Sequence, residues 1–244
     1  MKLLEITWGV KMEHPNQSGY LGAPSFTGVP SFKIKPKYLR AALNLLIKGT
    51  YRLKQKNVVK QICELQKTKD RKTIENTISI KLVEEMQKEQ ERYNIRADIL
   101  TPNLIHSCKN IEYSQIDIRF TWNNYSPNGY LAVEAKLLFG RVKRLGGPYV
   151  EEGVMDFVNE KYSWGHSHGI MAGYVLSEPI KKAILAVEKA LKKRKDETNE
   201  TSPFCEDNFI DYSLLFNSVH KQGNNGREIK ILHIFFDFAS KENF

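Results

Sequence analysis

The chain has 244 residues, 41% of them hydrophobic and 27% charged, which is the balance of a folded protein with a sizeable core. No run approaches the roughly 20 apolar residues that a transmembrane helix needs, so we expect no membrane partner. The formal net charge of +9, from 37 Lys and Arg against 28 Asp and Glu, favours a polyanionic partner; solubility alone is the alternative explanation.

The N-terminal segment and the cysteines favour a cytoplasmic location. The opening "MKLLEITWGVKMEHP" interrupts its apolar run with Glu5 and Lys11, so no signal peptide is expected. Cys63, Cys108 and Cys205 are scattered and form no CxxC pair, which is typical of a reducing compartment.

An irregular arm and a basic helical extension are predicted first. Residues 9–36 are dense in Gly, Pro and Ser and show no period of 2 or 3.6. Two short helices are predicted at 37–49, with Gly49 as the stop, and at 51–66, where Lys and Arg cover most of the solvent face. The predicted division of the chain is 1–70 for the arm and extension and 71–244 for the core.

A longer helix is predicted next, with Thr73 as its cap and Tyr93 at its end. Its apolar stripe, at roughly 100° per residue, consists of Ile74, Ile78, Leu82, Met86 and Tyr93. Glu75 lies inside this stripe. A Glu in a first helical turn also interacts favourably with the helix dipole, so a functional and a structural interpretation of Glu75 both stand.

The remaining segments predict an α/β fold with a central mixed β-sheet flanked by helices. Strands separated by turn residues favour hairpins, and apolar positions at helical spacing favour helices packed on the sheet. The predicted elements are a hairpin of strands 111–122 and 130–138, a helix at 149–163, a strand at 168–177, a helix from Pro179 with a cationic last turn, a polar loop at 195–203 and a closing hairpin of 209–221 and 228–238.

Three charged residues lie in two apolar strands of the first hairpin. Glu134 and Lys136 interrupt "YLAVEAKLL" and share one face of the strand, with about 7 Å between their backbone positions. Burying two charges costs several kcal/mol each unless they pair or bind something. Asp117 interrupts the preceding strand. It faces Glu134 if paired residue numbers add to an odd number, and lies on the opposite side if the sum is even; the loop does not decide between them.

With the odd register, Asp117 and Glu134 would converge, and a hard divalent cation would relieve their repulsion. Mg²⁺, with Mn²⁺ as a substitute, prefers such oxygen ligands. Asp117 and Glu134 would hold the metal, and Glu75 would complete its shell or act as a base. Lys136 would orient the attacking water or stabilise charge on a phosphate. The predicted chemistry is metal-assisted phosphodiester hydrolysis.

The [DE]xK triplet is weak evidence in so charged a chain. It also occurs at 70–72, in a solvated helix start, and at 228–230, at the beginning of a strand. Only Glu134 lies mid-strand with an acid on the strand before it. A structural ion pair between Glu134 and Lys136 remains the alternative.

Two further groups of residues have side chains that can bind a phosphate or a metal ion. Arg141, Lys143 and Arg144 directly follow the E-x-K strand and are predicted phosphate contacts, with a solvated loop as the alternative. A zinc site is not expected, because the spacing fits no zinc module. The residues that such a site would need are His106, Cys108, His166 and His168.

The order of a helix acid, a strand acid and E-x-K on the next strand, followed by a helix and a strand, resembles the PD-(D/E)xK nuclease superfamily. That is the fold of restriction endonucleases and Holliday junction resolvases. The stretches "QIDIRFTWNNYSPNGYLAVEAKLL" and "YVEEGVMDFVNEKYSWGHSHGIMAGYV" also resemble small bacterial restriction-endonuclease-like proteins found near defence genes. The resemblance covers about residues 73–240, and it departs at Ile116, where the pattern has Pro. It places the site roles on Asp117, Glu134 and Lys136, and on Glu75.

The resemblance implies an Mg²⁺-dependent DNA endonuclease in defence against phage or foreign DNA. DNA is the expected partner, and a homo-oligomer is compatible with the sequence. No Gly-rich phosphate loop is present, so an ATPase or sensor would be a separate protein. The alternatives are a non-catalytic nucleic-acid-binding or scaffold subunit and an RNA nuclease. Only contacts to a 2′-hydroxyl would distinguish an RNA nuclease from a DNA nuclease.

Overall fold

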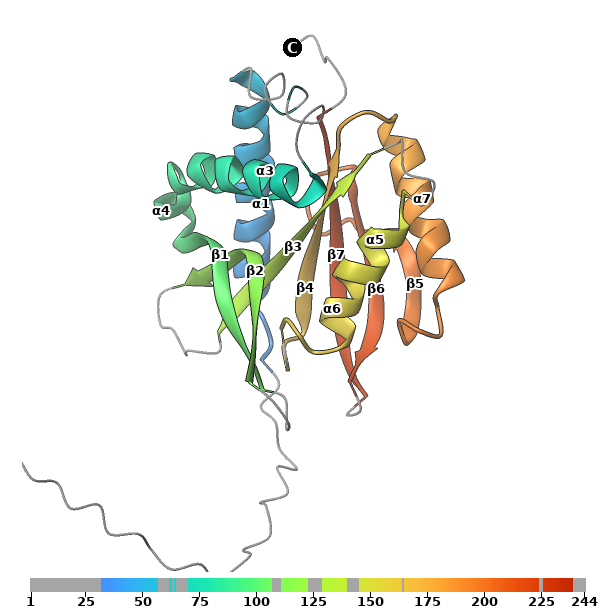
Figure 1. Cartoon of the computed structure of the whole chain (residues 1–244). Helices are drawn as coiled ribbons and strands as arrows, with labels where there is room; N and C mark the ends of the chain where they lie inside the picture. The colour runs from blue at the N-terminus through green and yellow to red at the C-terminus, as the bar shows by residue number, and fades with distance from the viewer. Residues whose placement is uncertain are drawn as a thin grey trace, which may run out of the picture.

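The computed structural model describes residues 32–56, 62, 64, 70–106, 111–122, 129–139, 145–163, 165–223 and 226–238, with the backbone alone at 100–106 and 111–115. Within these ranges a seven-stranded mixed sheet is flanked by helices, which confirms the predicted α/β architecture (Figure 1). The predicted arm falls almost entirely on residues 1–31, outside the described part. No helix in the described ranges is long and apolar enough to cross a membrane.

The strands lie in the order β1-β2-β3-β4-β7-β6-β5. The central strands β3, β4 and β7 are parallel, and the outer neighbours are antiparallel. Their bounds are β1 Ile95–His106, β2 Ile111–Trp122, β3 Tyr130–Leu138, β4 His168–Val175, β5 Glu200–Glu206, β6 Leu215–Gln222 and β7 Arg227–Asp237. Both predicted hairpins are confirmed.

Two strands differ from the sequence prediction. No element was assigned to 95–106, where β1 forms the edge beside β2. The predicted polar loop at 195–203 overlaps β5, which is the opposite edge strand and keeps most of its side chains exposed or half-exposed. An edge strand packs little apolar surface, so its sequence carries the composition of a loop.

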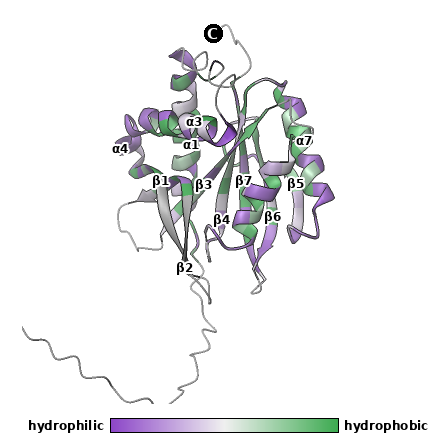
Figure 2. Cartoon of the chain, viewed as in Figure 1, coloured by the Kyte–Doolittle hydropathy of each residue, from purple (hydrophilic) through white to green (hydrophobic). Residues whose placement is uncertain are grey.

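The helices cover both faces of the sheet. Their bounds are α1 Pro36–Gln55, α3 Arg71–Gln87, α4 Gln90–Tyr93, α5 Gly147–Tyr149, the π-helical turn η1 Val150–Val154, α6 Met155–Val158 and α7 Ile180–Lys193. Helices α1 and α3 bury their apolar residues in one cluster with one face of the sheet, and α5 to α7 bury theirs in a second cluster. Figure 2 shows the matching alternation of hydrophilic and hydrophobic positions along α1, α3 and α7.

The predicted stop at Gly49 is wrong, because α1 continues through it to Gln55. A Cβ on Gly49 would lie 2.8 Å from Met86 Cγ and 2.9 Å from Leu82 Cδ1. The glycine therefore lets α1 approach α3 closely. Helix α1 shares a core with α3 and the sheet, so the predicted boundary at residue 70 does not separate two hydrophobic cores. The division of the chain into residues 1–70 and 71–244 stays a prediction.

Helix α3 begins three residues earlier than predicted. Asp70, not Thr73, is the N-cap, and its side chain accepts a hydrogen bond from the Thr73 N–H at 2.9 Å. The helix ends at Gln87, and the predicted continuation is the separate short helix α4. The predicted stripe from Ile74 to Met86 is buried, as expected.

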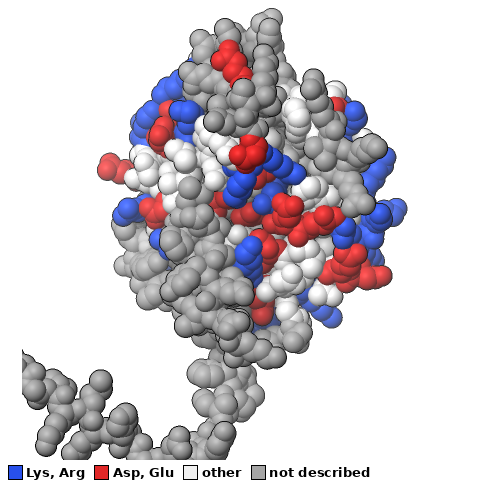
Figure 3. Space-filling view, viewed as in Figure 1, with Lys and Arg blue, Asp and Glu red and all other residues white. Residues whose placement is uncertain are grey.

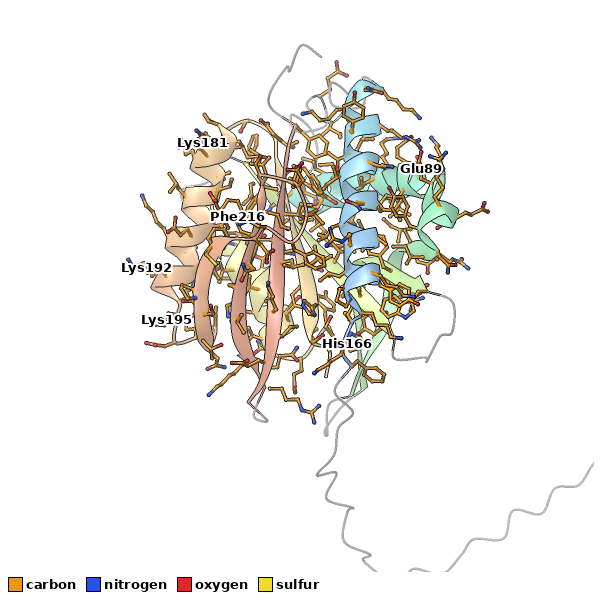
Figure 4. All side chains as sticks on the ribbon, turned by 180° about the vertical axis from the view of Figure 1, so that it is seen from behind. Glu89, His166, Lys181, Lys192, Lys195 and Phe216 are labelled. Carbon is orange, nitrogen blue, oxygen red and sulfur yellow. The ribbon has the colours of Figure 1, made fainter. Side chains whose placement is uncertain are left out.

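Helix α7 and the turn after it carry exposed lysines. Seen from behind, Lys181, Lys192 and Lys195 point outward along α7 and the turn that follows it (Figure 4). The cationic end of α7 is therefore a solvated surface that complements the helix dipole, as predicted.

A row of buried polar side chains, joined by hydrogen bonds, connects α5 with β7 and β6. Tyr149 Oη lies 3.1 Å from His233 Nδ1, and Ser218 Oγ bridges His233 Nε2 at 2.8 Å and His220 Nε2 at 2.7 Å. His220 Nδ1 lies 2.9 Å from the Thr198 carbonyl, which only accepts, so its proton is on Nδ1. Burial lowers the pKa of His220 to about 4 and that of His233 well below 6.5, which keeps both rings neutral.

We expect Ser218→Ala to lower the free energy of unfolding by about 2 to 4 kcal/mol, because it leaves one donor and one acceptor buried without partners. Urea denaturation followed by circular dichroism measures the change. The control is Ser213→Ala, at an exposed position nearby in the chain. A loss below about 0.5 kcal/mol for Ser218→Ala, within the range of ordinary surface substitutions, would contradict the role of this hydroxyl.

Candidate active site

The β2–β3 register is the odd one that brings the acids to one side. Ile118 pairs with Val133 and Phe120 with Leu131, so paired residue numbers add to an odd number. The pairing ends at Ile118, and its continuation places Asp117 opposite Glu134. Both side chains are buried.

Beyond this point β2 no longer pairs with β3, and two carboxylates take over main-chain donors of β3. The Ala135 N–H donates to Asp117 Oδ2 at 2.8 Å. Two residues further along, the Leu137 N–H donates to Glu75 Oε1 at 2.7 Å. Buried N–H groups need partners, so the divergence of the two strands creates places for acidic side chains.

Helix α3 is fastened to the same end of β3 by Arg71. Its Nε lies 3.0 Å from Glu75 Oε1, and its Nη2 donates to the Leu137 carbonyl at 2.8 Å. Glu75 thus accepts hydrogen bonds from the main chain and from the guanidinium, which hold the start of α3 against the strand. The sequence placed Glu75 on the inward stripe, and the structure buries it at 3% exposure.

Lys136 and Glu134 form a buried ion pair, with Nζ 2.7 Å from Oε1. This is the contact that the structural alternative predicted. It uses only one oxygen, and Glu134 Oε2 is buried without a hydrogen bond of ordinary geometry in the described structure. The Tyr162 hydroxyl lies near the same carboxyl, and burial together with Glu134 raises the pKa of that hydroxyl. An unpartnered buried carboxylate oxygen is unfavourable unless it is protonated or meets a cation.

The charges of the site are strongly coupled. Burial and the negative charge of Asp117 raise the pKa of Glu134 to about 8, against the opposing effect of Lys136. Burial works against the ammonium of Lys136, yet the neighbouring Glu134, Glu75 and Asp117 carboxylates raise its pKa above the ordinary value. Lys136 and Lys72 each pair with one of the two strand carboxylates, yet Asp117 still raises the pKa of Glu134, so a proton or a cation shared by the two acids would relieve their remaining repulsion.

The π-helical turn η1 packs over β3. A Cβ on Gly153 would lie 2.3 Å from Met171 Cε and 3.5 Å from Lys136 Cγ, so the glycine allows this close approach. Arg194, at the end of α7, forms an ion pair with Glu151 of the same turn. The sequence predicted one helix at 149–163, but the structure divides it into α5, η1 and α6, and π turns are frequent at functional sites.

Figure 3 shows carboxylates gathered across the middle of this face, between α3 and the α5 to α6 segment, with Lys and Arg beside them. Within the described ranges, no three His, Cys, Asp or Glu side chains are grouped so as to hold a metal ion. Glu75 is therefore not assembled into a three-residue group with Asp117 and Glu134. Mg²⁺ commonly binds through one or two carboxylates and several waters, so the donors of Asp117 and Glu134 fit such an ion.

The structure leaves the other predicted contacts in different situations. Arg141, Lys143 and Arg144 lie outside the described residues. His166 lies in the segment before β4 and is buried. Its ring packs edge-on against Phe32 and Tyr130, with centroid distances of 5.5 and 4.5 Å. The expectation that His166 belongs to no zinc site stays a prediction.

Lys72 reaches the site although its sequence pattern did not indicate this. Lys72 belongs to the 70–72 triplet that was set aside as a solvated helix start, yet its Nζ lies 3.1 Å from Asp117 Oδ1. It precedes Glu75 by three residues, and residues three apart lie on the same side of a helix. Given the inward position of Glu75, this three-residue spacing was the signal in the sequence that Lys72 also lies near the site.

No protein-family model matches this chain, and no curated protein or solved structure matches it either.

Proposed function

We propose that this chain is a metal-dependent nuclease that hydrolyses phosphodiester bonds of DNA, with a restriction-endonuclease-like core and a role in defence against phage or foreign DNA. The single observation that carries the proposal is the register that places Asp117 opposite Glu134 where β2 and β3 diverge. Glu134 Oε2, buried without a hydrogen bond of ordinary geometry, and Lys136 on the same face support it.

In this proposal Asp117 and Glu134 would hold one or two Mg²⁺ ions. A bound divalent cation supplies Lewis acidity, which lowers the pKa of an attacking water and neutralises phosphate charge. Lys136 donates a hydrogen bond to that water or to a phosphate oxygen, while Glu75 keeps β3 in place through the Leu137 N–H. The water oxygen forms a new bond to phosphorus, one phosphorus–oxygen ester bond breaks, and the leaving oxygen takes up a proton.

One observation favours the second candidate, a non-catalytic nucleic-acid-binding or scaffold subunit. Each strand carboxylate already has a lysine partner, because Lys136 pairs with Glu134 and Lys72 with Asp117. A site neutralised in this way can be purely structural. Such a chain would bind nucleic acid without cutting it.

The test is Mg²⁺-dependent cleavage by the purified chain. Supercoiled plasmid, linear duplex DNA and single-stranded RNA are incubated with the protein in Mg²⁺, in Mn²⁺ and in excess EDTA. We expect DNA cleavage in the presence of either metal and none with EDTA. Cleavage of RNA alone would replace the DNA assignment. Binding of DNA without cleavage under every condition would favour the non-catalytic subunit.

A further inference from the structure

Of the four oxygens on the two strand carboxylates, two are free of structural hydrogen bonds to the main chain or to Lys136. Asp117 Oδ2 is taken by the Ala135 N–H, and Glu134 Oε1 by Lys136. This leaves Asp117 Oδ1 and Glu134 Oε2. Glu134 Oε2 has no hydrogen bond of ordinary geometry in the described structure, and the Lys72 ammonium lies on Asp117 Oδ1 at 3.1 Å.

Lys72 differs in kind from the other cation of the site. The side chain of Lys136 is buried, whereas that of Lys72 is 54% exposed and rises from the first turn of α3. A half-exposed lysine on a flexible four-carbon stem can leave its partner without being desolvated or unpacked. Asp117 cannot follow it, because its other oxygen is fixed to the main chain of β3.

A divalent cation and the Lys72 ammonium cannot both lie at hydrogen-bond distance from Asp117 Oδ1. Two positive charges at hydrogen-bond distance from one oxygen repel each other strongly, so metal binding would expel the ammonium from this contact. The displaced cation would remain within the reach of its own side chain. The negative group that enters there during the proposed reaction is a phosphate of the substrate.

We propose that the Lys72 ammonium occupies the metal position in the metal-free chain. When metal and nucleic acid are bound, it binds a phosphate instead. This inference rests on the proposed nuclease function and deepens it. Lys72 thereby keeps Asp117 neutralised between cycles of metal binding and adds a positive charge for the substrate.

The first measurement is Mn²⁺ affinity, determined by isothermal titration calorimetry on metal-free protein without nucleic acid. We expect Lys72→Gln to bind Mn²⁺ about fivefold more tightly than the wild type, the order of a partly exposed ion pair that no longer competes. Lys72→Arg keeps the competing charge and should stay close to the wild type. The matched control is Lys56→Gln, which also removes a half-exposed lysine paired with a buried carboxylate, Glu85, at 2.7 Å.

The second measurement is DNA cleavage at saturating Mg²⁺. Lys72→Gln should raise KM for DNA about tenfold with a smaller change in kcat, because it removes a contact to phosphate that binds substrate and transition state alike. Lys72→Arg should restore most of the KM, and Lys56→Gln should leave both parameters unchanged.

The outcomes separate this inference from the proposed function. Equal or weaker Mn²⁺ affinity in Lys72→Gln, with normal binding by the wild type, would overturn the inference and leave the nuclease proposal standing. A wild type that binds Mn²⁺ but cuts no nucleic acid would overturn the nuclease proposal and the phosphate role, whereas tighter Mn²⁺ binding by Lys72→Gln would still support the metal competition. Absence of any Mn²⁺ binding by the wild type would overturn both.

Discussion

Lys136→Met is expected to lower Mg²⁺-dependent DNA cleavage by about 10³-fold, within the range of 10² to 10⁴ for loss of a group that moves a proton or stabilises developing charge. Methionine keeps most of the length and volume of the lysine stem. The burial of Glu134 then favours its protonated form, so the variant need not hold an unpaired charge. Initial cleavage rates of a plasmid, together with far-ultraviolet circular dichroism, measure activity and fold separately.

The chain contains a matched control for this experiment. Residues 228–230 repeat the same E-x-K pattern, and Lys230 also forms an ion pair, with Asp207 at 2.7 Å. Lys230→Met should therefore retain cleavage close to the wild-type rate. Equal activity of Lys136→Met, Lys230→Met and the wild type would remove Lys136 from the site and favour the structural ion pair.

Glu134 is expected to make the metal-free chain less stable as the pH rises from 6.5 to 9. The pKa of Glu134 in the folded chain is about 8, above its ordinary value of 4.5, so folding takes up a proton between these values. The stabilisation is complete below pH 4.5 and is lost as the pH rises through 8. Between pH 6.5 and 9 the free energy of unfolding should fall by about 2 kcal/mol more in the wild type than in Glu134→Gln.

Divalent metal should remove this pH dependence, because it replaces the proton on the ionised carboxylate. Chemical denaturation at several pH values, with Mg²⁺ or with EDTA, measures the effect. Mg²⁺ should stabilise the wild type most at the alkaline end and leave Glu134→Gln unaffected. The control is Glu85→Gln, at a buried acid whose pKa is lowered by Lys56 and Lys88 against the effect of burial. Parallel curves for wild type and Glu134→Gln would contradict the raised pKa.

Local patterns predicted much of the fold and part of the site. The apolar stripe of α3 and the inward position of Glu75 follow from the helical period, which depends only on residues within a few turns. Glu134 and Lys136 share a face because strand residues two apart always do. Turn residues between apolar runs were enough to predict the β2–β3 and β6–β7 hairpins.

Features that depend on distant neighbours were missed or misread. Gly49 has the sequence signature of a helix stop, and only the approach of α3 explains why the helix continues. Strand β5 carries the polar composition of a loop because it lies at an edge of the sheet. Lys72 was set aside with a solvated triplet, since nothing near it in sequence indicates that Asp117 lies within 3.1 Å.

The charges embedded in apolar strands, and the common face of Glu134 and Lys136, follow from the amino-acid order alone, because strand geometry alternates side chains regardless of tertiary context. Whether Asp117 joins them depends on the folded chain. Its position depends on the pairing register and on the point where β2 leaves β3, beyond which Asp117 and Glu75 accept hydrogen bonds from the β3 main chain. Neither register nor divergence is encoded in local periodicity, because a shift of one residue preserves the apolar and polar alternation of each strand while moving Asp117 to the opposite face.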